Sequence, residues 1–172
     1  ATNSIQVGAG GFHSFSVSAS GVLTGWGDNR YGQATPPAGL SNVVAVAGGA
    51  FHSLALRADG RVVAWGSNAG GQTNVPANLS NVVAIAARDE YNLALKSDGT
   101  VVGWGSNVNG RLSIPAGLTA VKRIATGDRH VLALKQNGQI TAWGGNSIGQ
   151  TTVPAAAANA TAIGAGSLHS AV

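Results

Sequence analysis

Cysteine is absent from this chain of 172 residues, and charged residues make up only 9% of it. The absence of cysteine excludes disulfides, thiolate metal sites and thiol catalysis, and it leaves the redox compartment unspecified. No apolar run approaches the roughly 18 residues of a membrane-spanning helix, and no basic and then apolar signal segment starts at Ala1. We therefore expect no membrane span.

What the chain does contain favours tightly turned β structure. Glycine occurs 26 times, and the remainder is rich in Ala, Val, Ser, Thr and Asn, a composition that favours strands and turns over helix. The length suffices for one domain that buries roughly 70% of the surface of its unfolded chain.

A strict repeat of 39 residues runs through the sequence without insertion or deletion. Its most regular columns are Trp26, Trp65, Trp104 and Trp143; Gly21, Gly60, Gly99 and Gly138; Asn29, Asn68, Asn107 and Asn146; and Pro37, Pro76, Pro115 and Pro154. A further column contains His13, His52, Tyr91, His130 and His169. We therefore treat residues 1–172 as one repeat domain, with units 1–39, 40–78, 79–117 and 118–156 and a partial fifth unit at 157–172.

Each unit has the pattern of a small antiparallel sheet. In the second unit, residues 42–49 are β-branched and small, and residues 52–66 read as two alternating strands around an Asp-Gly turn. Gly60 supplies the positive φ of a two-residue turn, and Leu54 and Leu56 alternate toward one face. The QTNVP stretch of this unit is a candidate short outer strand. We expect three or four strands per unit, and units that stack because so small a sheet cannot bury its own faces.

The small residues of each first strand favour radial stacking over a linear solenoid. Two columns there are Gly8, Ala47, Ala86, Ala125 and Gly164, and Ala9, Gly48, Ala87, Thr126 and Ala165. Small side chains suit the crowded hub of a β-propeller, and the tryptophans fill the wider space further out. A solenoid repeat is shorter than this one. The sequence therefore predicts an all-β chain of β-propeller blades, each with three to four antiparallel strands.

The stretch HSLALRADGRVVAWG followed by NAGGQTNVP resembles the repeat of the regulator-of-chromosome-condensation β-propeller superfamily, over essentially the whole chain. Within that superfamily, residues 142–154 are most similar to the repeats of beta-lactamase inhibitory protein II. The resemblance implies a propeller but not one activity, because the superfamily includes nucleotide-exchange factors and enzyme inhibitors. It also implies a ring of seven blades.

This sequence has about four and a half units, so the predicted propeller is an open arc with two uncovered blade faces. Three arrangements would cover them: the chain is a fragment of a longer array, copies complete a ring by oligomerisation, or the terminal half-units pair between molecules. We expect a fragment or a homo-oligomer.

The candidate catalytic and metal-binding patterns have simpler explanations. Residues 145–149 match the G-x-S-x-G nucleophile elbow at Ser147, but sibling units lack the serine and no helix is predicted to follow. Residues of the histidine column lie on separate blades, so hydrogen bonding within the sheet is favoured over metal ligation. Asp89, Glu90 and Asp128 could approach one another, but Arg88 and Arg129 share their loops and favour ion pairing. We predict no enzyme activity, no metal and no cofactor.

The formal net charge of +4 raises the alternative of nucleic-acid binding. Several basic residues fall in the third and fourth units: Arg88, Arg111, Lys122, Arg123 and Arg129. No aromatic residues are interleaved with them to stack on bases. Nucleic acid is therefore disfavoured as a partner.

The loop tips vary while the columns that shape the backbone stay fixed. The variable positions precede the histidine column and follow the tryptophan, on what we expect to be two rims of the propeller. Unconstrained drift is one explanation, and a composite binding surface is the other. The candidate partner-binding residues are Phe12, Asp28, Arg30, Tyr31, Phe51, Asp89, Glu90, Asp128 and Arg129.

The resemblance implies that these loops present aromatic and acidic side chains to a partner enzyme, as in the inhibitor-like repeats. Phe12, Phe51, Tyr31 and Asp28 fit that character, whereas Glu90, Arg129 and Leu168 do not fit the aromatic pattern. The sequence thus predicts a non-enzymatic module for protein-protein interaction, extracellular or at a bacterial-like cell surface. The alternatives are a beta-lactamase inhibitor and a structural, self-assembling surface repeat.

Overall fold

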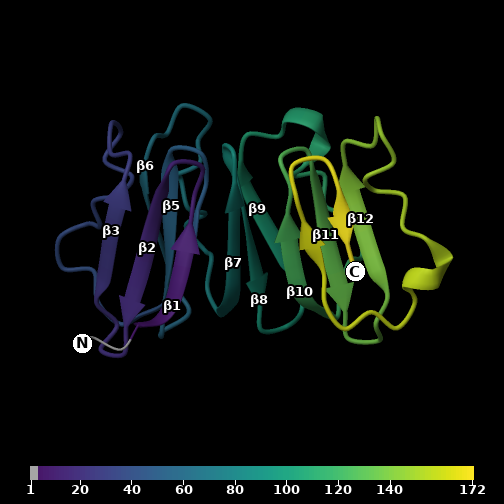
Figure 1. The fold of residues 1–172 in the computed structure, drawn as a ribbon. Helices are drawn as coiled ribbons and strands as arrows, with labels where there is room; N and C mark the ends of the chain where they lie inside the picture. Colours follow the sequence, from purple (N-terminus) through teal and green to yellow (C-terminus); the bar gives the residue numbers. More distant parts are fainter. Residues whose placement is uncertain (1–3) are drawn as a thin grey trace.

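The structure, a computed structural model, describes residues 4–172 as a series of small antiparallel sheets (Figure 1). We call each sheet a blade and number the blades from the N-terminus. The blades comprise β1 (Ser4–Ala9), β2 (His13–Ser18) and β3 (Leu23–Gly27); β4 (Val43–Gly48), β5 (His52–Arg57) and β6 (Val62–Gly66); β7 (Val82–Arg88), β8 (Tyr91–Lys96) and β9 (Val101–Gly105); β10 (Val121–Thr126), β11 (His130–Lys135) and β12 (Ile140–Gly144); and β13 (Gly164–Ala165) with β14 (Ser170–Ala171). Two short 3-10 helices, η1 (Val108–Gly110) and η2 (Ala155–Ala157), are the helical elements of the described residues.

The blades follow one another around an open arc (Figure 1). The first strands β1, β4, β7, β10 and β13 lie next to one another along the inside of the arc. This hub is crowded, as predicted: a Cβ added at Gly8 would lie 2.8 Å from the Val46 carbonyl oxygen, and one at Gly48 would lie 2.6 Å from the Cα of Gly10. Both distances are shorter than a carbon atom tolerates, so these positions require glycine.

Two details of the predicted blade are wrong. The QTNVP stretch forms turns and no outer strand, because the Gln72 side chain folds back to accept a hydrogen bond from the Gly70 amide at 2.7 Å. The second hairpin turn is longer than two residues. The Gly60 amide donates to the Arg57 carbonyl and the Arg57 amide to the Arg61 carbonyl, which is the three-residue loop with a left-handed glycine, at φ 76°.

The middle strands β5, β8 and β11 are buried on both faces because each lies between two neighbouring blades. Leu54 and Leu56 of β5 pack toward the third blade, against Trp104, whereas Ala55 packs toward the first blade, with Phe15. The predicted alternation of the leucines is therefore confirmed. The opposite face, which simple alternation would leave to solvent, is buried by the preceding blade.

A hydrogen-bonded lock joins each blade to the next. The indole Nε1 of Trp65 donates to the backbone carbonyl of Gln33 in the preceding blade at 2.9 Å, and the Ser53 hydroxyl donates to the same oxygen at 2.8 Å. His13, also in the preceding blade, bonds Ser53 through Nε2 at 2.7 Å. Trp104, Asn92, Gln72 and His52 repeat this arrangement between the second and third blades.

The lock between the second and third blades fixes which nitrogen of the His52 imidazole carries the proton. The Asn92 amide nitrogen donates to the Gln72 carbonyl, so its oxygen, 2.6 Å from His52 Nε2, is left to accept. His52 therefore carries its proton on Nε2, and its buried Nδ1 has no partner among the described residues. The expected bonding of the histidines within one sheet is wrong: they bond across the interface between blades.

Trp26 shows what the lock requires. This indole is 52% exposed because no preceding blade covers it in the described residues, whereas Trp104 is 6% exposed. We expect Trp104→Ala to lower the free energy of unfolding by about 3–5 kcal/mol, since it empties a buried site and removes an interblade hydrogen bond. Trp26→Ala should cost far less. Urea unfolding of both variants measures the difference, and equal losses would contradict the packing role.

Acid should destabilise the interfaces between blades. Burial lowers the pKa of His13, His52 and His130 below the ordinary imidazole value. Above the unfolded pKa of about 6.5 both states are neutral and stability is full. Below it, the unfolded chain binds protons that the folded chain refuses, so the free energy of unfolding falls as pH drops toward the folded pKa values. Urea midpoints measured from neutral pH down to mildly acid pH should decrease, and His52→Gln should flatten that decrease.

Candidate binding rim

The two sets of variable loops lie on one rim. In each complete blade the first and third strands run in the same direction and the second runs back, so the first loop and the segment after the third strand share an end (Figure 1). Backbone hydrogen bonds join them: the Asp28 amide donates to the Phe12 carbonyl at 2.9 Å, and the Ser67 amide to the Phe51 carbonyl at 2.8 Å. The prediction of two separate rims is therefore wrong. We call this end the loop rim; it comprises the loops at 10–12, 49–51, 89–90, 127–129 and 166–168 and the turns at 28–31, 67–70, 106–109 and 145–148.

Four of the predicted partner-binding residues form one cluster on the loop rim, in which Phe51 is half-buried and the other three are exposed. The rings of Phe12 and Phe51 stack across the first two blades with centroids 5.5 Å apart, and Tyr31 lies 5.3 Å from Phe51. The Arg30 guanidinium lies 5.6 Å from the Phe51 ring centre. Phe12 and Tyr31 are 62% and 56% exposed. We call these four residues the aromatic cluster.

Asp28 orders the turn that carries the cluster. Its carboxylate accepts hydrogen bonds from Arg30 Nε at 3.0 Å and from the Gln33 amide nitrogen at 2.9 Å. These bonds, the one from Arg30 above all, hold the pKa of Asp28 below its usual value. The residue therefore positions Arg30 over the aromatic rings.

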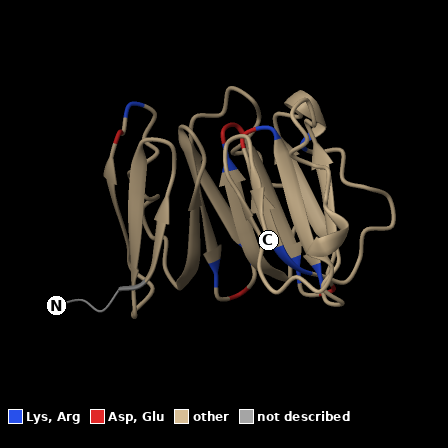
Figure 2. Cartoon of the chain, turned by 45° about the vertical axis from the view of Figure 1, so that its right-hand side comes forward, with Lys and Arg blue, Asp and Glu red and all other residues tan. Residues whose placement is uncertain are grey.

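The remaining predicted residues lie on the third and fourth blades. Arg88 Nε lies 2.5 Å from Asp128 Oδ1, and Arg111 Nη1 lies 2.7 Å from Asp89 Oδ2. Both aspartates form ion pairs, as expected, but the partner of Asp89 is Arg111 and not an arginine of its own loop. Glu90 and Arg129 form no ion pair among the described residues. Figure 2 shows that charges gather at the strand ends and leave the sheets nearly free of them.

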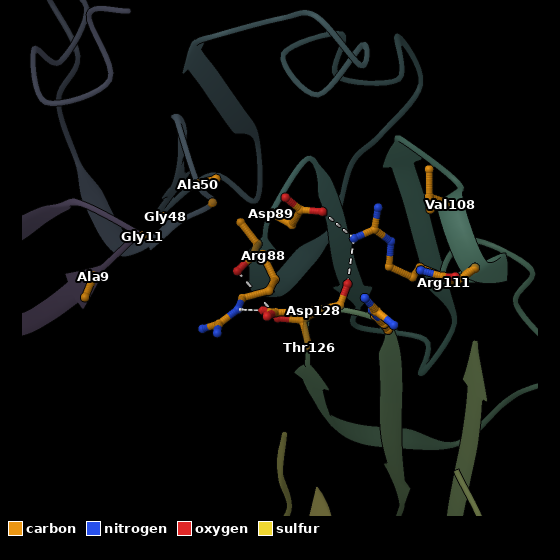
Figure 3. Close-up of a pocket in the computed structure, with 15 residues that line it drawn as sticks. Ala9, Gly11, Gly48, Ala50, Arg88, Asp89, Val108, Arg111, Thr126 and Asp128 are labelled. Atoms are coloured by element: carbon orange, nitrogen blue, oxygen red, sulfur yellow. Dashed lines mark hydrogen bonds and ion pairs between the residues drawn. The ribbon is translucent and has the colours of Figure 1, made fainter. Parts of the chain in front are cut away.

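A cavity of about 660 Å³ opens on the loop rim where the inner strands end. Its wall on the first two blades is made of small residues, among them Gly10, Gly11 and Ala50. Its other wall carries charged residues of the third and fourth blades. These are Arg88, Asp89, Arg111 and Asp128, which Figure 3 labels, and Arg129. Phe12 and Phe51 directly follow two of the wall residues, so the aromatic cluster borders the cavity.

The repeat with its interblade lock matches one known family. The model of the regulator of chromosome condensation (RCC1) repeat matches residues 5–33, 43–72, 82–111 and 121–150, which is more than half of the chain. The chain belongs to the RCC1 repeat family. The matched segments each cover one blade and end at the Gln33, Gln72, Arg111 and Gln150 column of the lock. Curated proteins gave no significant match to the chain.

Solved structures share the RCC1 propeller fold at low sequence identity. Prp20p from Saccharomyces cerevisiae is 22% identical with a TM-score of 0.80, over 98% of this chain and 55% of that one. The ectodomain of the receptor kinase CR4 from Physcomitrella patens is 19% identical with a TM-score of 0.75, over 96% and 46%. Human WBSCR16 is 25% identical with a TM-score of 0.71, over 89% and 51%. The chain spans about half the length of these proteins.

The RCC1 repeat chain shows none of the other candidate sites in its described residues. Ser147 lies in a turn that no α-helix follows. No group of three or more metal-ligating side chains occurs within residues 4–172, and no helix there is long and apolar enough to cross a membrane. The closer likeness to beta-lactamase inhibitory repeats stays a prediction.

Arg111 is the site residue that sequence reasoning missed. The column that contains Gln33, Gln72 and Gln150 in the other RCC1 repeats has Arg111 in the third unit. The histidine column changes in the same unit, where Tyr91 replaces the histidine. This paired exception in two otherwise regular columns is the signal that marks the interface between the third and fourth blades.

Proposed function

We propose that this chain is a non-enzymatic protein-binding module, and that its partner docks on the loop rim. The observation that carries the proposal is the aromatic cluster, because the exposed Phe12 and Tyr31 both pack there against the half-buried Phe51, outside the core. Exposed aromatic patches with an arginine are typical of binding hot spots. Asp89, Glu90, Asp128 and Arg129 supply a charged region beside the cluster, where a partner would find its polar contacts.

The family supports a protein as the partner. Prp20p was described with its binding properties to Gsp1p and histones, and it was also solved with Kap60 bound. The fold of this chain is shared with that protein, and binding of proteins by the rim is the activity that the exposed cluster favours. An extracellular location and inhibition of beta-lactamases stay predictions within this proposal.

Alanine substitution of Phe12, Tyr31 and Phe51 tests the aromatic cluster. The partner is isolated on the wild-type chain, purified and titrated as a single protein against each variant. We expect each change to weaken binding by roughly ten- to thirtyfold, in line with about 2 kcal/mol for a hot-spot side chain. Val22→Ala, an equally exposed apolar change at the opposite end of the blades, is the matched control and should leave affinity unchanged.

Two further measurements separate the alternatives. Inhibition of a class A beta-lactamase by the wild-type chain, lost in the aromatic variants, would specify the partner class. If the chain is instead a self-assembling structural repeat, rim variants leave the solution mass unchanged, and Trp26→Ser alters it. Affinity that is equal in wild type and in all three aromatic variants would contradict the proposed rim.

A further inference from the structure

The arginine at position 111 breaks the repeat at a structural cost. In the other blades the glutamine of this column closes its own turn by accepting a backbone amide, as Gln33 does from Tyr31 at 2.9 Å and Gln72 from Gly70 at 2.7 Å. A guanidinium cannot accept, so this turn loses its bond, and Asn109 takes a left-handed φ of 62°. The charged Arg111 side chain is also 2% exposed, in a chain whose other lock residues are neutral.

The surroundings of Arg111 have changed to hold the buried charge. Tyr91 replaces the histidine of the lock, lies 4.6 Å below the guanidinium and donates to the Gly127 carbonyl at 2.8 Å. Val131 stands where Ser53 and Asn92 relay the hydrogen bond in other blades. Packing alone does not explain why three positions depart together from a neutral lock that serves the neighbouring interfaces. Local departures that lower stability are typical of functional positions.

The guanidinium is only partly satisfied by the protein. Nη1 donates to Asp89 Oδ2 and to the Asp128 carbonyl oxygen, each at 2.7 Å. Nε is buried without a partner, and Nη2 makes no hydrogen bond within residues 4–172. Arg111 lines the cavity on the loop rim, so an unpaired donor of a buried cation borders a space open to ligands (Figure 3).

The charge of the cavity favours an anion. Three arginines and two aspartates line it, which leaves one positive charge in excess. The aspartates are already engaged: Asp128 accepts from Arg88 Nε and from the Ser167 hydroxyl, and Asp89 accepts from Arg111. The exposed Arg129 has no ion-pair partner among the described residues. The volume of about 660 Å³ lies within the range of ligand pockets.

We propose that this cavity binds an anionic oxygen group, a phosphate or a carboxylate, with Arg111 as the central donor. The guanidinium presents planar N–H groups that match the oxygens of such an anion. Arg129 and the outer edge of Arg88 flank it, and the glycines of the opposite wall leave room for the rest of the ligand. The site stands on contacts separate from those of the aromatic cluster, so it holds whether or not the rim binds a protein.

Titration with inorganic phosphate and, separately, with acetate tests the proposal. Backbone and arginine N–H resonances are followed by NMR at low ionic strength. We expect saturable shifts at Gly10, Gly49 and Arg111, whose chemical environments border the cavity. A stronger response to phosphate assigns the phosphate source, and a stronger response to acetate assigns a carboxylate; both support the site.

The decisive variant is Arg111→Gln, which restores the residue of the other repeats and should fold for that reason. This substitution should lower the affinity for the more tightly bound of the two anions about tenfold or more, since a hydrogen bond to a charged group is lost. Arg57→Gln, which removes an equal charge at the opposite end of the blades, is the control and should leave binding unchanged. Undiminished binding in Arg111→Gln, no saturable shift with either anion, or wild-type shifts centred on Arg57 would each overturn the proposal.

Discussion

The second, third and fourth blades each depend on the carbonyl oxygen that the preceding blade offers to their tryptophan indole. A three-stranded sheet has two apolar faces and too little area to bury either alone, so it must pack against a neighbouring sheet. The tryptophan covers one face of its own blade and ends in a donor that must be satisfied once buried. Because the acceptor is a backbone oxygen fixed by the turn after the third strand, the bond sets both the spacing and the angle of successive blades.

The same turn that supplies this acceptor also carries the variable residues. The buried Gln33 holds the turn from inside, with its amide oxygen on Tyr31 and its amide nitrogen on Asp28, while the side chains of Arg30 and Tyr31 face outward. Function can therefore change on the outside without loosening the lock. The interface between the third and fourth blades is the exception, because there the inner residue itself, Arg111, is charged and borders a cavity.

The loop rim combines two chemically different regions. On the first two blades it presents the aromatic cluster, and on the third and fourth it presents paired and unpaired charges around the cavity. The two meet because the arc brings successive first loops side by side: the Gly11 amide donates to the Gly49 carbonyl, and the Ala50 amide to the Asp89 carbonyl, each at 2.9 Å. A ligand or partner on this rim meets residues separated by many tens of positions in sequence.

The sequence alone determined the blade, the family and the positions free to vary. A strict period reports what every unit must repeat, namely glycines with positive φ, the middle strand and the tryptophan, because each copy meets the same neighbours. The period could not determine the geometry of the turn after the third strand, because a hydrogen bond from the Gly70 amide to the Gln72 side chain decides it locally. The predicted outer strand was wrong for this reason. The tertiary structure decided what lies together: that both loop sets share one rim, that the histidines bond across blades, and that Arg111 meets Tyr91, Asp89 and the cavity. These are contacts between units, and a repeat fixes them only once the blades are stacked.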